Sequence, residues 1–182
     1  MSKFFVEIGA ANFDTLLPLA KMGWKGIVVE PIPYLAEQLR DIFADYNVNI
    51  VEAAISDYNG TIQMIVANED HWITGASHVV SSNHIGYRLS DHPDRAKDFS
   101  EGVIRVQCMT LDNLLRSIDH VDVMKVDVEG HELNVFMNYS FNVKPSVIKV
   151  EHKHVDDKIL RRKLETNGYM VWTESEDLYA IS

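Results

Sequence analysis

Short apolar runs alternate with longer segments of helical periodicity along most of the chain. The runs are rich in β-branched residues, which favours strands, and the segments between them repeat apolar residues every three or four positions. This alternation predicts strand–helix–strand units and a mostly parallel sheet. The expected strands are residues 3–8, 26–30, 48–55, 121–127 and 146–151, and residues 169–182 are expected to form a closing hairpin.

The segments between these strands carry helix start and stop signals. Asp14 is suited to cap a helix that ends near Met22, and Thr110 is suited to open a short helix. Gly168 suits the position that follows a helix end. The predicted helices span residues 14–22, 31–46, 110–118, 131–139 and 156–168.

The alternation is interrupted after the third predicted strand. Residues 56–60 have turn chemistry and residues 61–68 form a further extended segment, so the chain adds a strand pair before the alternation resumes. Residues 69–102 show no sustained period and hold four of the eight histidines. A loop of this length inside a compact domain is usually functional or disordered. We interpret it as an acceptor lid with Trp72, Ser77, His78 and Tyr87 as contacts, and a variable surface loop is the alternative.

Length and composition limit the class of protein. The chain is expected to be one domain over residues 1–182, and its single cysteine, Cys108, excludes an internal disulfide and favours a reducing compartment. The formal charge of −10 argues against a nucleic-acid surface, because phosphates need compensating cations. No run approaches the about 18 consecutive apolar residues of a membrane-spanning helix, and residues 1–9 lack a secretory-signal pattern. We therefore expect a cytoplasmic protein without nucleic-acid or membrane partners.

The carboxyl ends of the predicted parallel strands carry many carboxylates. Ligands of open parallel sheets bind at this edge. An acidic edge repels phosphate but suits a ligand with ribose hydroxyls and positive charge, such as S-adenosylmethionine with its sulfonium and α-amino groups. The residues at the edge are Glu7, Gly9, Asn12, Glu30, Ala54, Ser56, Asp57, Asp127, Glu129, Glu151 and His152.

Three of these residues have separate predicted roles. Glu7 is expected near the methionine end of the ligand, Gly9 to allow close backbone approach, and Glu30, about 20 residues onward, to accept ribose hydroxyls. The alternatives are a plain salt bridge for Glu7, an ordinary turn for Gly9 and a helix-entry charge for Glu30. A nicotinamide-dependent oxidoreductase is a weaker hypothesis because the G-x-G-x-x-G motif is missing.

Several sequence blocks resemble one protein family. The blocks "VEIGAANFD", "VVEPIPYLAEQL", "EAAISDYNGTI", "TLDNLL", "DVMKVDVEGHELNVF" and "PSVIKVEH" occur in order over residues 4–152, and "KVDVEGHE" is the most specific. They are similar to the FkbM family of S-adenosylmethionine-dependent methyltransferases. The resemblance implies an α/β, Rossmann-like class I methyltransferase fold with a mostly parallel seven-stranded sheet and helices on both faces. It also implies methyl transfer, most often to a hydroxyl on a sugar or another small metabolite.

The same resemblance gives roles to matching positions, with Asp127 facing the reacting groups. The first loop departs from the family pattern, because Glu7 replaces the usual aspartate and an additional alanine precedes Asn12. A catalytically inactive S-adenosylmethionine-binding module, acting as a partner or regulatory subunit, is therefore the main alternative function. The expected cofactor-binding residues are Glu7, Gly9, Asn12, Glu30, Ala54, Ser56, Asp57 and Asp127.

A hydroxyl acceptor requires a base, because its proton must leave. Asp127 is the first candidate as the last residue of its predicted strand, and His131 is the second because its unperturbed pKa is near neutrality. The other candidate bases are Glu129, Glu132, Glu151 and His152. Asp127 and Glu151 are also an alternative pair of ligands for a divalent ion. No metal site is predicted, and "HKH" at residues 152–154 is interpreted as a polar strand end.

Overall fold

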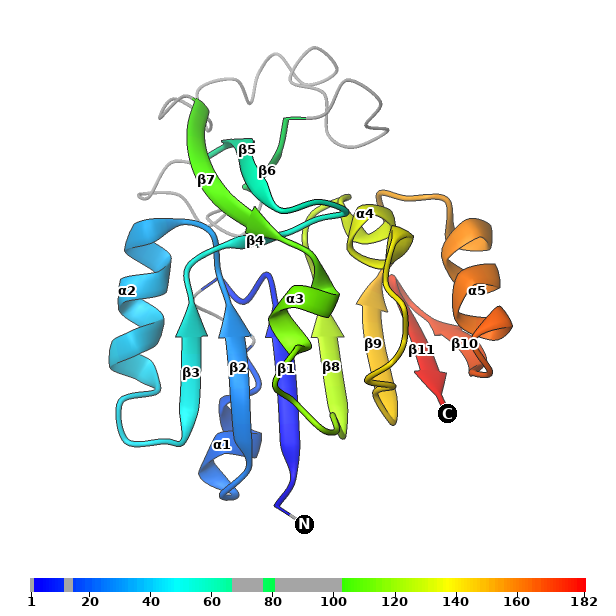
Figure 1. Ribbon diagram of the computed structural model, residues 1–182, viewed down its shortest axis with the longest axis horizontal. Coiled ribbons are helices and arrows are strands. Elements are labelled where there is room, and N and C mark those ends of the chain that lie inside the picture. Colours follow the sequence, from blue (N-terminus) through cyan, green and yellow to red (C-terminus); the bar gives the residue numbers. More distant parts are fainter. Residues whose placement is uncertain (1, 12–14, 67–76, 81–102) are drawn as a thin grey trace.

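A seven-stranded sheet runs through the centre of the molecule (Figure 1). The computed structural model describes residues 2–11, 15–66, 77–80 and 103–182. The strands of the sheet are β1 (Phe4–Ile8), β2 (Lys25–Val29), β3 (Val48–Val51), β8 (Val123–Val126), β9 (Val147–Glu151), β10 (Met170–Glu174) and β11 (Asp177–Ile181). The strands lie in the order β10-β11-β9-β8-β1-β2-β3. The neighbouring strands β9, β8, β1, β2 and β3 pair in parallel, whereas β11 pairs antiparallel with both β9 and β10. The predicted mostly parallel sheet and closing hairpin are confirmed.

Helices cover both faces of this sheet. Within the described ranges they are α1 (Leu17–Lys21), α2 (Pro33–Ile42), α3 (Leu111–Leu115), α4 (Glu132–Met137) and α5 (Asp157–Thr166). Side chains of α3, α4 and α5 cluster with Val6 and Ile8 on one face, and side chains of α1 and α2 cluster with Phe5 on the other. Neighbouring residues of β1 therefore point to opposite faces, as the period of a strand requires. The expected placement of helices on both faces is confirmed.

The helix ends follow the predicted signals in part. The hydroxyl of Thr110 accepts a hydrogen bond from the Asn113 N–H at 3.2 Å, and Gly168 follows α5 with a φ of +79°, so both signals are confirmed. The predicted cap Asp14 lies outside the described residues. The segment predicted as a helix over residues 31–46 forms the shorter α2, which begins at Pro33 because proline suits the first helical turn. No helix in the described ranges has the length and apolar character needed to cross a membrane.

A second, four-stranded sheet lies over the carboxyl ends of the central strands (Figure 1). Its strands are β4 (Ala54–Ile55), β5 (Gly60–Ile65), β6 (His78–Val79) and β7 (Val103–Met109), in the order β4-β7-β5-β6. The prediction of one strand over residues 48–55 is wrong, because the chain leaves the central sheet after Val51. The N–H of Ala53 donates to the Val51 carbonyl at 3.1 Å, and this tight turn lets Ala54 pair with Cys108 of β7.

The segments before and after the predicted long loop become partners in the second sheet. β5 and β7 pair in antiparallel register from Gly60 and Cys108 to Ile65 and Val103. The short strand β6 pairs with the end of β5, so the prediction of a loop without strands over residues 69–102 is wrong at this point. The rest of that segment, with Trp72 and Tyr87, lies outside the described residues.

Candidate active site

A cleft lies between the carboxyl edge of the central sheet and the second sheet. Ile8 and Asp127 line it from the central strand ends, and Met64 and Val79 line it from β5 and β6. The space between these walls is about 530 Å³, and part of it is open to solvent. Most lining residues are apolar, and the polar side chains among them are Glu30, Ser77, Asp127, Glu129 and His131.

Gly9 brings the end of β1 against the end of β8. Its φ is +76°, and a Cβ at this position would lie 1.8 Å from the carbonyl oxygen of Asp127. Hydrogen bonds hold both chains in place, because the N–H of Gly9 donates to the Val29 carbonyl at 3.0 Å and that of Asp127 to the Ile8 carbonyl at 2.9 Å. The close approach at Gly9 is therefore to the protein backbone, and only glycine fits there.

Glu30 lies at the end of β2, where it lines the cleft and is 4% exposed. Its Oε1 accepts from the N–H of Ile32 and its Oε2 from the N–H of Ala11, both at 2.9 Å. Burial raises the pKa of Glu30 to about 7, although these two backbone hydrogen bonds lower it. The carboxylate is thus fixed in orientation and keeps further lone pairs for a ligand hydroxyl.

Glu7 is fully buried and is not among the described residues that line the cleft. Its Oε2 accepts from the Leu16 N–H at 2.8 Å, and its Oε1 lies 3.5 Å from Nζ of the buried Lys125. The structure therefore places Glu7 in a salt bridge that also holds the segment leading into α1. A direct contact of Glu7 with a cofactor remains a prediction. Asn12, which was also predicted to bind the cofactor, lies outside the described residues.

A short hydrogen-bonded chain connects Asp57, Ser56 and His131. The hydroxyl of the buried Ser56 donates to Oδ1 of Asp57 at 3.1 Å and lies 3.0 Å from Nε2 of His131. The hydrogen bond with the Ser56 hydroxyl therefore fixes the orientation of the His131 imidazole. His131 and Ala54 line the cleft, whereas Ser56 and Asp57 lie behind it as support for the imidazole.

The carboxyl ends of β8 and β9 bring several carboxylates together. Asp127 and Glu129 line the cleft, and Glu151 lies next to them at the end of β9. Burial, followed by the charge of Asp127, raises the pKa of Glu129 to about 7, and the same causes raise the pKa of Glu151 to about 8. The charge of Asp127 acts on the carboxyl group of Glu151, as expected if the two side chains lie near each other.

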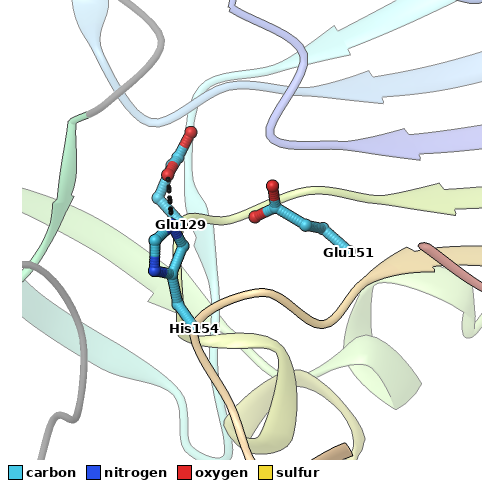
Figure 2. A group of neighbouring side chains, drawn as sticks. All are labelled: Glu129, Glu151 and His154. Atoms are coloured by element: carbon cyan, nitrogen blue, oxygen red, sulfur yellow. Dashed lines mark ion pairs between the residues drawn. The ribbon is translucent and has the colours of Figure 1, made fainter. Parts of the chain in front are cut away.

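His154 completes this group and was not predicted as a functional residue. Its Nε2 lies 3.6 Å from Oε2 of Glu129, and Figure 2 shows the Glu151 carboxylate turned toward this pair. The "HKH" pattern marks the position of His154 in the sequence, but its proximity to Glu129 depends on the turn after β9. Val79 in the cleft wall was also not predicted, since β6 has only two residues, whereas Ser77, named as a contact in the predicted lid, does line the cleft.

Comparison with known proteins identifies the fold and the family. The sequence matches the methyltransferase FkbM domain over residues 7–171, and a comparison with curated protein sequences gives no match. The structure of T. thermophilus 16S rRNA N2 G1207 methyltransferase (RsmC) with AdoMet and guanosine is similar, with 11% identity, a TM-score of 0.51, and coverage of 99% of this chain and 37% of that chain. Monomeric WbdD is similar with 9% identity, a TM-score of 0.52, and coverage of 100% of this chain and 36% of that chain.

The chain thus spans little more than a third of the length of these two proteins, and at such identity the likeness concerns the fold. The central sheet and its helices form the expected Rossmann-like class I methyltransferase fold. The domain match begins at Glu7 in the first strand and extends into β10, so that it includes all of the cleft residues described above. The protein belongs to the FkbM methyltransferase family.

Proposed function

We propose that the protein is an S-adenosylmethionine-dependent methyltransferase that methylates a hydroxyl of a sugar or another small metabolite. The observation that carries the proposal is the position of Glu30 in the cleft, where the N–H groups of Ala11 and Ile32 fix its two oxygens. A carboxylate held in this way can accept both hydroxyls of a ribose. Membership of a methyltransferase family supports the proposed reaction.

The chemistry of the cleft fits S-adenosylmethionine. Ile32 and Leu35 offer apolar surface beside Glu30, against which an adenine ring can pack. Asp127 offers negative charge for the α-amino group and the sulfonium. The carboxylates of Glu30 and Asp127 would repel the pyrophosphate of a nicotinamide cofactor, so NAD fits this cleft less well.

Methylation of a hydroxyl requires the protein to take up one proton. S-adenosylmethionine, when bound, supplies a methyl group on a cationic sulfur, which keeps the electron pair of the broken bond and becomes a neutral thioether. His131 and Asp127 both line the cleft and are the candidate proton acceptors. Ser56 orients the imidazole of His131 through its hydrogen bond with Nε2. Glu151 lies further from the cleft wall and is the third candidate.

The acceptor is expected to be a small molecule. The formal charge of −10 and the acidic cleft disfavour a polyanion, because its phosphates would meet carboxylates. The rRNA substrate of the T. thermophilus enzyme is a property of that protein, which shares only the fold with this chain. A hydroxylated metabolite without phosphate is the acceptor most compatible with these charges.

A methyl-transfer assay tests the proposal. Purified protein is incubated with methyl-labelled S-adenosylmethionine and a panel of monosaccharides, other hydroxylated metabolites and ribosomal RNA. We expect label on a hydroxylated small molecule and none on RNA. Transfer to RNA alone would contradict the proposed acceptor class, and cofactor binding without transfer to any acceptor would favour the catalytically inactive module.

A further inference from the structure

Glu129, Glu151 and His154 lie together at the carboxyl ends of β8 and β9 (Figure 2). One ligand atom from each lies within 4.8 Å of the other two. Ligand atoms that surround one cation at about 2.0–2.6 Å are separated by at most about 5 Å, so this spacing fits a single ion. Glu129 also lines the cleft, which places the group at the border of the candidate active site.

One carboxylate oxygen of this group and one of the neighbouring Glu132 lack a donor among the described residues. Glu132 is fully buried, and its Oε1 accepts from the N–H groups of Val128 and Gly130, whereas its Oε2 has no hydrogen-bond partner among the described residues. Oε2 of Glu151 is also buried without a partner in the described part of the chain. A buried carboxylate oxygen without a donor is costly, and Oε2 of Glu151 belongs to a residue of the group, so this observation points to a cation independently of the ligand spacing.

Nearby side chains compensate this negative charge only in part. Nζ of Lys153 is 3.0 Å from Oε1 of Glu176, and the Lys153 side chain is about half exposed, so its charge is shared with Glu176 and with solvent. His154 faces Glu129 and carries charge only when it is protonated. A bound divalent cation would compensate two carboxylates at once, without protonation of either.

We propose that Glu129, Glu151 and His154 form a binding site for one divalent first-row transition cation, such as Mn²⁺ or Zn²⁺. The imidazole separates this set from the all-oxygen sites that Mg²⁺ and Ca²⁺ prefer. The sequence indicates Asp127 and Glu151 as an alternative pair of ligands for a divalent ion. The proposed site shares Glu151 with that pair, and its other ligands are Glu129 and His154.

The position of the cation gives it a role that rests on the proposed function. At the border of the cleft it would bind the oxygen of the acceptor hydroxyl and lower the pKa of that hydroxyl, which facilitates loss of the proton to the base. Glu129 would connect the cation site to the cleft, since it belongs to both.

The site is tested without cofactor or acceptor, so the result does not depend on the proposed function. Protein treated with chelator is titrated with MnCl₂, followed by electron paramagnetic resonance, and with ZnCl₂, followed by calorimetry. We expect saturation at about one cation per chain, and losses of at least about tenfold in affinity for Glu151→Gln and His154→Ala. His120→Ala is the matched control, because Nε2 of His120 lies 3.4 Å from Oδ2 of Asp122 at the opposite end of β8.

Each outcome of the titration decides for or against the site. Wild-type affinity in His120→Ala together with weakened binding in the other two variants supports it. Absence of saturable binding by the folded protein, or equal affinity in all variants, overturns it. Circular dichroism of each variant is compared with that of the wild type, so that a loss of affinity is assigned to the site only in a variant that is folded. If the cation binds but chelator leaves methyl transfer unchanged, the site stands and its role in acceptor activation is rejected.

Discussion

Replacement of Gly9 with alanine tests the contact between the ends of β1 and β8. The new Cβ would lie 1.8 Å from the carbonyl oxygen of Asp127 and 3.1 Å from Cγ1 of Val128. The oxygen would have to move by about 1.2 Å to reach 3.0 Å, below which Cβ contacts are essentially not seen. This backbone cannot give way as a flexible side chain does, because the Asp127 N–H is hydrogen-bonded to Ile8 at 2.9 Å.

The expected loss of stability has two parts. A residue with a Cβ in the left-handed conformation costs about 1–2 kcal/mol, and overpacking against the backbone adds about 1–3 kcal/mol. Gly9→Ala is therefore expected to lower the free energy of unfolding by about 2–5 kcal/mol. Gly23→Ala is the matched control: its φ is +84° and no described atom lies within 4 Å of the added Cβ, so only the conformational part, about 1–2 kcal/mol, applies.

Urea unfolding followed by circular dichroism measures both variants. The difference between their unfolding free energies should be about 1–3 kcal/mol, which is the steric part alone. Gly9→Ala should also weaken the binding of S-adenosylmethionine, because Asp127 lines the cleft, and Gly23→Ala should not. Equal unfolding free energies for the two variants would refute the steric argument.

Three further predictions concern protonation, catalysis and packing. Burial raises the pKa of Glu30 from 4.5 to about 7, so the folded protein binds the proton of the Glu30 carboxyl group more tightly than the unfolded chain does. As the pH rises from 4.5 to above 7 this proton is lost, and the free energy of unfolding should fall by about 3 kcal/mol. Glu30→Gln should remove this part of the pH dependence in urea unfolding, and an unchanged dependence would contradict the buried position of Glu30. His131→Asn should lower the rate of methyl transfer by about 10²–10⁴ without weakening cofactor binding, whereas a parallel loss of affinity would indicate a binding role. In α5, Leu164→Ala should lower the free energy of unfolding by about 2–5 kcal/mol, because Leu164 is fully buried. Ile159→Ala, at a 53% exposed position, should lower it by only about 0.5 kcal/mol, so similar unfolding temperatures of the two variants would contradict this packing.

The central sheet could be predicted because its strands and helices differ clearly in hydrophobic period. The segment over residues 48–55 is an exception, since neither Glu52 nor Ala53, where the chain leaves the sheet, is a typical turn residue. Ala54 joins the second sheet through pairing with Cys108, and such a contact between distant residues is not encoded in a local pattern. The two-residue strand β6 is too short to produce a period.

The candidate site could be predicted where a residue's place follows from the strand that precedes it. Glu30 lies at the cleft because it directly follows β2, as its spacing from Gly9 indicated. Glu7 belongs to a strand as well, but its side chain faces Lys125 across the β1–β8 register, and that pairing is a property of the assembled sheet. His154 reaches Glu129 only through the turn that follows β9.

The most direct test of the proposed function is calorimetric titration with S-adenosylmethionine and, separately, with NAD. The wild-type protein is compared with Glu30→Ala and with Glu37→Ala, a control at an exposed glutamate whose Oε2 lies 2.8 Å from Arg40 on the surface of α2. We predict that S-adenosylmethionine alone binds, that Glu30→Ala weakens its binding, and that Glu37→Ala leaves it unchanged. Binding of neither ligand by the folded protein, or equal affinity for S-adenosylmethionine in all three proteins, would contradict the proposed cofactor site.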